Sequence, residues 1–224
     1  MGNGFAADSS IWGAVNSWQK CSGIRLLEET QELVSIRYTF AAPAMPGLKT
    51  EITYTVDGSH MHVDVHYSGG AGRPQLPLFG LRFATPASVE EVEWIGLSGE
   101  TYPDRKKGGI FGKHSEAPHI PDYPVPQECG CHMDTHQKSL HLSNRALTVE
   151  KVNAPYAFSA IPYTPQQLSE AGHAYELPAP CRTVVGIYGA MRGVGGINSW
   201  GADVEESYQI ASDADISFSF RIRL

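Results

Sequence analysis

The 224-residue sequence lacks most of the short patterns that assign a protein to a chemical class. It contains no glycine-rich phosphate loop, no dinucleotide-binding fingerprint and no G-x-S-x-G serine elbow. Apolar runs never approach the roughly 20 residues that span a bilayer, and no secretory signal pattern opens the chain. Lys and Arg number 17 against 24 Asp and Glu, with no basic stripe. We therefore expect neither nucleic acid nor a membrane as a partner.

Cysteine and helical periodicity are also scarce. Four cysteines in a chain of this length do not make a disulfide scaffold, so a reducing, cytoplasmic setting is expected. Residues 164–173 predict one short helix, because a threonine cap precedes a proline at the first helical position. Residues 10–18 predict a second short turn of helix.

Strand signals fill most of the remaining sequence. The run "LKTEITYTVDGSHMHVDVHYSG" (residues 48–69) alternates polar and apolar residues on both sides of an Asp-Gly-Ser turn, which predicts a β-hairpin. The last ten residues alternate in the same way. Further strands are expected at 33–42, 78–85, 89–97, 139–144, 146–152, 157–163 and 183–191. The pattern predicts one all-β domain over residues 1–224, a large antiparallel sandwich with one or two short helices.

Two groups of residues have the chemistry of metal ligands. His60, His62 and His66 share one face of the hairpin strand with Asp64, where two such histidines could hold a metal. A solvated or subunit-facing strip is the favoured interpretation, because no further ligand is fixed by the sequence. The run "CGCHMDTH" (residues 129–136) lacks the Cys-x-x-Cys spacing of zinc sites and is interpreted as a loop with free thiols. We expect no metal and no cofactor.

Five stretches, in this order, resemble one known family. The stretches are "LPLFGLRFATP" (76–86), "VEEVEWIGLSGETYPDRKKG" (89–108), "YPVPQECG" (123–130), "FSAIPYTPQQLSEAGHAYELP" (158–178) and "GVGGINSWG" (193–201). Through them the chain resembles the C-terminal domain of the large β-galactosidases of glycoside hydrolase family 2, which also occurs separately as the small subunit of two-chain β-galactosidases.

The resemblance implies a galactose mutarotase-like supersandwich. It also implies that the two catalytic glutamates of the retaining mechanism lie on the barrel of another domain or chain. No catalytic residue is therefore expected here, and the isolated chain should be inactive. Its expected partners are a large catalytic chain and a galactoside substrate.

The family's tryptophan in the last motif contacts the sugar that leaves, which makes Trp200 the expected substrate contact, assisted by Asn198. Gly195 and Gly196 are expected to let the backbone bend so that the indole projects. An ordinary core position is the alternative for Trp200.

Other positions that match the motifs are interpreted as structural or interface residues. These are Glu100, Tyr102, Asp104, Arg105 and Glu128, with Gly195 and Gly196. The chain departs from the motifs at Thr101, Cys129, Arg192, Ile197 and Asn198. We also expect it to lack the family's first strands, in which case the exposed edges could pair with another copy.

Two other functions remain open. The chain could be a mutarotase-like aldose epimerase, for which His62 or His66 would have to meet a glutamate on the concave face of the sheet. It could also be a non-catalytic carbohydrate-binding module.

Overall fold

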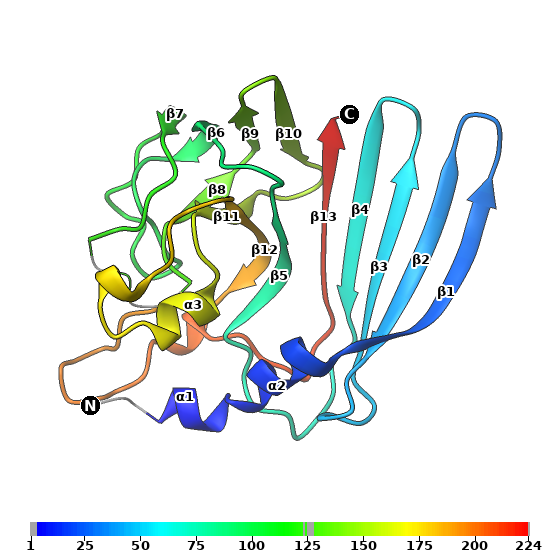
Figure 1. The fold of residues 1–224 in the computed structure, drawn as a ribbon. Helices are drawn as coiled ribbons and strands as arrows, with labels where there is room; N and C mark the ends of the chain where they lie inside the picture. The colour runs from blue at the N-terminus through cyan, green and yellow to red at the C-terminus, as the bar shows by residue number, and fades with distance from the viewer. Residues whose placement is uncertain (1–3, 123, 125–127, 224) are drawn as a thin grey trace.

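Two antiparallel sheets of unequal size make up the molecule, which the computed structural model describes over residues 4–122, 124 and 128–223 (Figure 1). The larger sheet has nine strands, in the order β1-β2-β3-β4-β13-β10-β9-β6-β7. Their bounds are β1 Lys20–Glu29, β2 Val34–Ala41, β3 Lys49–Val56, β4 His60–Tyr67, β13 Ile216–Arg223, β10 Arg145–Lys151, β9 Gln137–Leu142, β6 Glu91–Leu97 and β7 Phe111–Glu116.

The smaller sheet has four strands, in the order β5-β12-β11-β8. Their bounds are β5 Leu78–Ala84, β12 Val184–Met191, β11 Tyr156–Ile161 and β8 Cys131–Thr135. The predicted all-β antiparallel sandwich is confirmed.

Helix is confined to the ends of the sheets. The helices are α1 (Phe5–Asp8), α2 (Ile11–Trp18) and α3 (Pro165–Glu170), with single 3-10 turns η1 (Ala174–Glu176) and η2 (Glu206–Tyr208). Both predicted helices, α2 and α3, are confirmed. Thr164 caps α3, because its hydroxyl accepts from the Gln167 amide while the Gln167 side chain returns to the Thr164 amide.

Three strands escaped the sequence prediction: β1, β7 and β8. The interpretation of residues 129–136 as a loop is wrong for Cys131–Thr135, which pair with β11. The strand forms because β11 is buried at all six residues and offers its backbone to a neighbour. Tyr123 and residues 125–127 of the third motif lie outside the described residues.

The core lies between the two sheets. Apolar side chains from the inner face of the large sheet pack against those of the small sheet. From the large sheet these are Val63, Val65, Val92, Leu140, Val149 and Phe220, and from the small sheet Phe79, Phe158, Val185 and Ile187. Burial of these rows from water is the main force that holds the sheets together.

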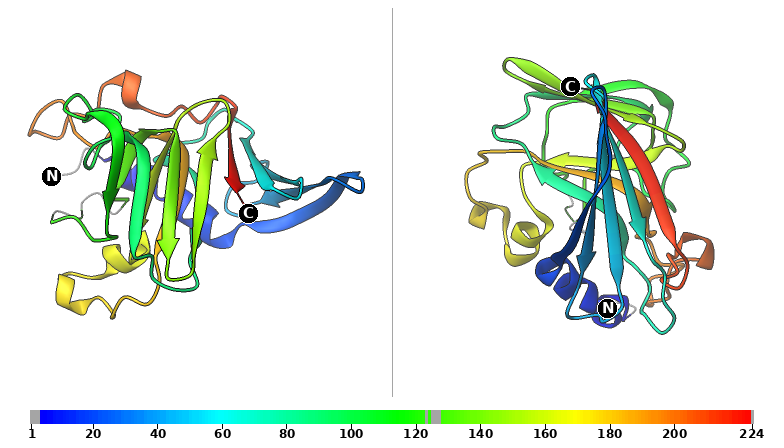
Figure 2. Two further views of the ribbon diagram at one scale, coloured as in Figure 1. Left: turned by 90° about the horizontal axis from the view of Figure 1, so that it is seen from above. Right: turned by 90° about the vertical axis from the view of Figure 1, so that its right-hand side faces the viewer.

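The strands β1, β2 and β3 form a wing that extends beyond the small sheet (Figure 1, Figure 2). The exposed fraction rises along the wing until β1 is exposed at all ten of its residues. Ile24 is 67% exposed and Leu26 53%. Strands normally bury at least one face, so the wing presents an uncovered surface.

Lys138 on β9 is fully buried between the sheets. It stands opposite Trp94 and Val149 in the ladder and therefore shares their inward-facing side. Its Nζ donates to the Gly186 carbonyl oxygen at 3.3 Å and lies 4.8 Å from the centre of the Phe158 ring. Burial disfavours the charged amine and holds the pKa of Lys138 well below its ordinary value.

Replacing Lys138 with Met should remove a pH-dependent destabilisation. Between the lowered folded pKa and the unfolded value near 10.4, the unfolded chain binds more protons, so wild-type stability rises with pH in that window. Each unit by which burial lowers the pKa costs about 1.4 kcal/mol below the folded pKa. Urea unfolding of both proteins from pH 6 to pH 9 should show Lys138→Met to be the more stable, with an advantage that shrinks as pH rises. An advantage that grows with pH would contradict this account.

Candidate functional site

The segment 193–202 after β12, called here the Trp200 loop, is tied to the body by one carboxylate. Asp104 accepts from the Val194 amide at 3.0 Å through Oδ1 and from the Gly195 amide at 2.7 Å through Oδ2. The Gly193 amide donates to the Tyr208 carbonyl oxygen at 2.9 Å. Three successive amides are thus satisfied, so the beginning of the loop has a defined path.

Asn198 organises the tip of the loop. Its Oδ1 accepts from the Trp200 amide at 2.9 Å and from the Ala202 amide at 3.4 Å. Trp200 itself is 85% exposed, and Ile197 is 66% exposed. The core alternative for Trp200 is therefore wrong, because its indole projects from a loop whose backbone is tied to Asp104 and Asn198.

At Gly195 and Gly196, neighbouring groups come so close to the backbone that no side chain would fit without displacing them. A Cβ on Gly195 would lie 2.6 Å from Arg105 Nη2, and one on Gly196 would lie 2.4 Å from the Ala202 carbonyl oxygen. The left-handed backbone falls instead at Gly201, with φ of 92°. Gly195 and Gly196 therefore leave space for Arg105 and for the Ala202 backbone, while the left-handed turn lies at Gly201.

Beside the loop lies a network of the other motif residues. Glu100 Oε1 accepts from the Tyr102 hydroxyl at 2.6 Å and from the Gly130 amide at 2.7 Å. Burial, with Cys131 and Glu100 close by, raises the pKa of Tyr102. These contacts fix the chain before β8 against the chain after β6.

Glu128 connects the small sheet to this network. It contacts Arg82 Nη2 at 2.5 Å and accepts from the Tyr188 hydroxyl at 3.1 Å. Burial raises the pKa of Glu128, and the Arg82 charge partly opposes that shift. Glu100 and Glu128 thus hold these segments against the small sheet.

The Trp200 loop and this network enclose a hollow of about 760 Å³. Its lining includes Glu100, Tyr102, Arg105, Glu128, Asn198 and Ser199, and Phe5 of α1 closes one side. Sequence reasoning did not assign a role to Arg192, which the structure places in this lining. Arg192 is buried, pairs with Asp203 and lies with its guanidinium carbon 3.8 Å from the centre of the Phe5 ring.

The histidines of β4 lie on the outer, polar face of the large sheet. His62 stands opposite Thr55 and Arg221, and His66 opposite Glu51 and Ser217. His66 Nε2 lies 3.8 Å from Asp215, and His62 Nε2 lies 4.0 Å from Asp57. Val63 and Val65 face the core between them, so neither histidine reaches the concave inner face.

The thiols of Cys129 and Cys131 are buried. Burial raises the pKa of Cys129 to about 11 and that of Cys131 well above its ordinary value. Such thiols resist the deprotonation that metal binding needs. Within the residues that the structure describes, no three His, Cys, Asp or Glu side chains are grouped to hold a metal.

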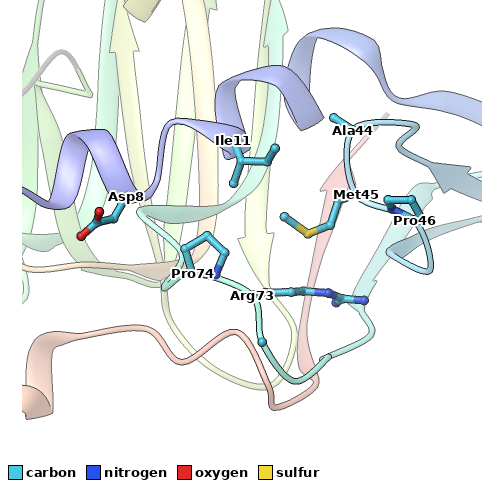
Figure 3. Close-up of a pocket in the computed structure, with 8 residues that line it drawn as sticks. Asp8, Ile11, Ala44, Met45, Pro46, Arg73 and Pro74 are labelled. Atoms are coloured by element: carbon cyan, nitrogen blue, oxygen red, sulfur yellow. The ribbon is translucent and has the colours of Figure 1, made fainter.

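A second hollow, wide and shallow, lies between α1, α2 and two loops at the foot of the wing (Figure 3). Asp8, Met45 and Arg73 are among its lining. Arg73 is already engaged, because it donates to the Tyr67 hydroxyl at 3.0 Å and to the Ser68 carbonyl oxygen at 2.8 Å. This hollow offers little chemistry beyond a surface contact.

The fold and the site define an all-β sandwich domain with a displayed aromatic loop and no membrane-crossing helix among the described residues. The family model for the β-galactosidase small chain matches residues 6–222. The chain therefore belongs to the β-galactosidase small chain family.

Individual relatives agree with this assignment. A β-galactosidase small subunit from Latilactobacillus sakei is 40% identical over 99% of this chain and 80% of that protein. A β-galactosidase from Halalkalibacterium halodurans is 35% identical over 96% of this chain. The match covers only 22% of that longer protein.

Solved structures are more distant. A putative aldose 1-epimerase from Escherichia coli covers 90% of this chain and 68% of its own, with TM-score 0.46 and 12% identity. A galactose mutarotase-like protein from Lactobacillus casei gives TM-score 0.42 and 7% identity, with 89% and 72% covered. These values are too low to compare individual residues.

Replacing Asp104 with Ala should loosen the Trp200 loop locally. The two amides of Val194 and Gly195 lose a charged acceptor, which is worth on the order of 2 kcal/mol. Amide hydrogen exchange at these residues should accelerate by about 30-fold. The exposed Asp213, replaced with Ala as a control, should leave that exchange unchanged. Equal exchange in wild type and Asp104→Ala would contradict the assigned role.

Proposed function

We propose that this chain is the non-catalytic small part of a β-galactosidase and completes the rim of a catalytic pocket on a large partner chain. Trp200 is the observation that carries the proposal. Its indole is 85% exposed, stands on a loop with a fixed path, and offers an apolar aromatic face suited to stacking on a sugar.

In the assembled enzyme, the Trp200 indole stacks on the leaving-group sugar of a galactoside, and Asn198 keeps the loop in place. Ile197, 66% exposed beside it, contacts the large chain. The catalytic acid and nucleophile belong to the large chain, in a retaining mechanism of the glycoside hydrolase family 2 type. This chain contributes no metal or cofactor, works in the cytoplasm, and is a candidate for a homo-oligomer of the whole assembly.

The acidic residues of the site support a non-catalytic role. Glu100 is occupied by Tyr102 and the Gly130 amide, and Glu128 by Arg82 and Tyr188. Carboxylates held in this way organise loops and are poorly placed to attack a sugar. The epimerase alternative fares worse, because His62 and His66 lie on the outer face, away from Glu128. A carbohydrate-binding module remains the second candidate, favoured by the same exposed Trp200.

The direct test is reconstitution with a large chain. The isolated chain should not hydrolyse nitrophenyl-galactoside, because the proposal puts both catalytic carboxylates on the large chain. Mixed with the purified large chain of its source, it should restore turnover in proportion to the complex formed. Hydrolysis by the pure chain that disappears when one of its own glutamates is replaced would overturn the proposal. Sugar binding with no effect on a large chain would favour the binding module.

Trp200→Ala should raise the KM of the reconstituted enzyme for lactose several-fold and leave kcat little changed. Stacking on a sugar contributes about 1 kcal/mol, by analogy with aromatic pairs, and acts in ground and transition states alike. Because the indole is exposed, the Tm of the isolated chain should stay the same. The matched control is Trp18→Ala, which removes another exposed indole at 66% exposure. A KM unaffected by Trp200→Ala, or raised equally by Trp18→Ala, would exclude the sugar contact.

A further inference from the structure

The inner face of the large sheet stays apolar after the small sheet stops covering it. One row of directly opposed residues runs Phe218, Val65, Ile52, Tyr38 and Ile24, from β13 to β1. Val65 is 1% exposed and Ile52 8%, whereas Ile24 is 67% exposed. Residues opposed in an antiparallel ladder share a face, so Ile24 lies on the same side of the sheet as the core.

A second row of directly opposed residues, two positions away on each strand, shows the same pattern. It runs Phe220, Val63, Tyr54, Ile36 and Leu26. Val63 is 1% exposed and Leu26 53%. The inner face of the wing is therefore apolar, like one side of a sandwich core. Among the described residues, no second sheet covers its outer part.

The small sheet ends where this uncovered face begins. Among the described strands, β5 pairs only with β12, so its other edge is open. On the large sheet, by contrast, strands continue past this point through β3, β2 and β1 (Figure 1). An open strand edge offers unpaired amide and carbonyl groups to another chain.

A groove of about 410 Å³ lies between the open edge of β5 and the apolar face of the wing. Its floor is the wing face at Phe40 and Ile52, its side is β5 from Leu78 to Arg82, and α2 closes it with Trp12. The groove therefore presents both the backbone edge of β5 and apolar side chains of the wing. An extended peptide satisfies both at once, because its backbone pairs with the edge while alternate side chains enter the apolar face. A small apolar ligand would leave the edge unpaired.

We propose that this groove takes an extended segment of the large catalytic chain, added as a strand to the free edge of β5 with its alternate apolar side chains on the wing. This inference rests on the proposed function, since the large chain is the partner that function supplies. The added strand continues the small sheet over the inner part of the wing, where Phe40, Thr50 and Ile52 line the groove.

A second copy of this chain fits the groove less well. Every named strand is already paired within its own fold, so a copy has no spare strand among the described residues to donate. The outer edge of β1 also discourages pairing between wings, because two register shifts and the charges of Lys20, Arg25 and Glu28 interrupt it.

The test compares charges placed on the two faces of the wing. Phe40→Lys and Thr50→Lys, made separately, put an ammonium group on the floor of the groove at positions that are only partly buried. Each should weaken binding of the purified large chain by about tenfold or more in sedimentation analysis. The control is Thr39→Lys on the polar face of β2, beside Glu51, which should bind as wild type. In the wild-type complex, amides along β5 should become protected from hydrogen exchange.

Other outcomes assign the failure to one proposal or the other. If no large chain binds or restores activity, the proposed function fails. If activity is restored while β5 stays unprotected and both lysine variants bind normally, the groove inference alone is overturned. Protection of β5 that depends on protein concentration without the large chain would show a second copy as the occupant and would likewise overturn it.

Discussion

Face-to-face packing of the two sheets is the interaction on which the rest of the structure depends. Each sheet is amphipathic, and the inner rows exclude water only where both sheets are present. Phe158, Val185 and Ile187 of the small sheet close over Val63, Leu140 and Val149 of the large one. This contact orients β12, and the end of β12 sets the starting point of the Trp200 loop. It also leaves the outer part of the wing without a second sheet over its inner face, among the residues that the structure describes.

Trp200 is held in its exposed position by polar contacts to the backbone of its loop, and these contacts lie away from the indole itself. Asp104 belongs to the chain after β6 and reaches across to the amides that follow β12. Asn198 then closes the tip of the loop through its own side chain. The Asn198 amide oxygen accepts from two backbone amides of the tip. Ile197 beside it adds an exposed apolar group.

The sequence allowed much of the fold to be predicted, for reasons visible in individual strands. The hairpin of β3 and β4 alternates cleanly, and its Asp-Gly-Ser turn has a glycine with φ of 81°, so local pattern and structure agree. β8 could not be found in this way, because Cys131–Thr135 are short, polar in part and strand-forming only through β11. β1 was missed because its exposed sequence "KCSGIRLLEE" mixes charge with apolar residues and its pairing is interrupted twice.

By itself, the sequence determined the all-β class, the two short helices, the order of the five motifs and the family to which they belong. These features depend on local periodicity, capping and residue identity, which neighbouring positions encode. Only the tertiary structure decided that Asp104 holds the loop of Trp200, that Lys138 is buried, that the β4 histidines face outward, and that the wing and the β5 edge border one groove. Each of these joins residues far apart in the chain, and the pairing of strands and the closing of one sheet on another bring them together.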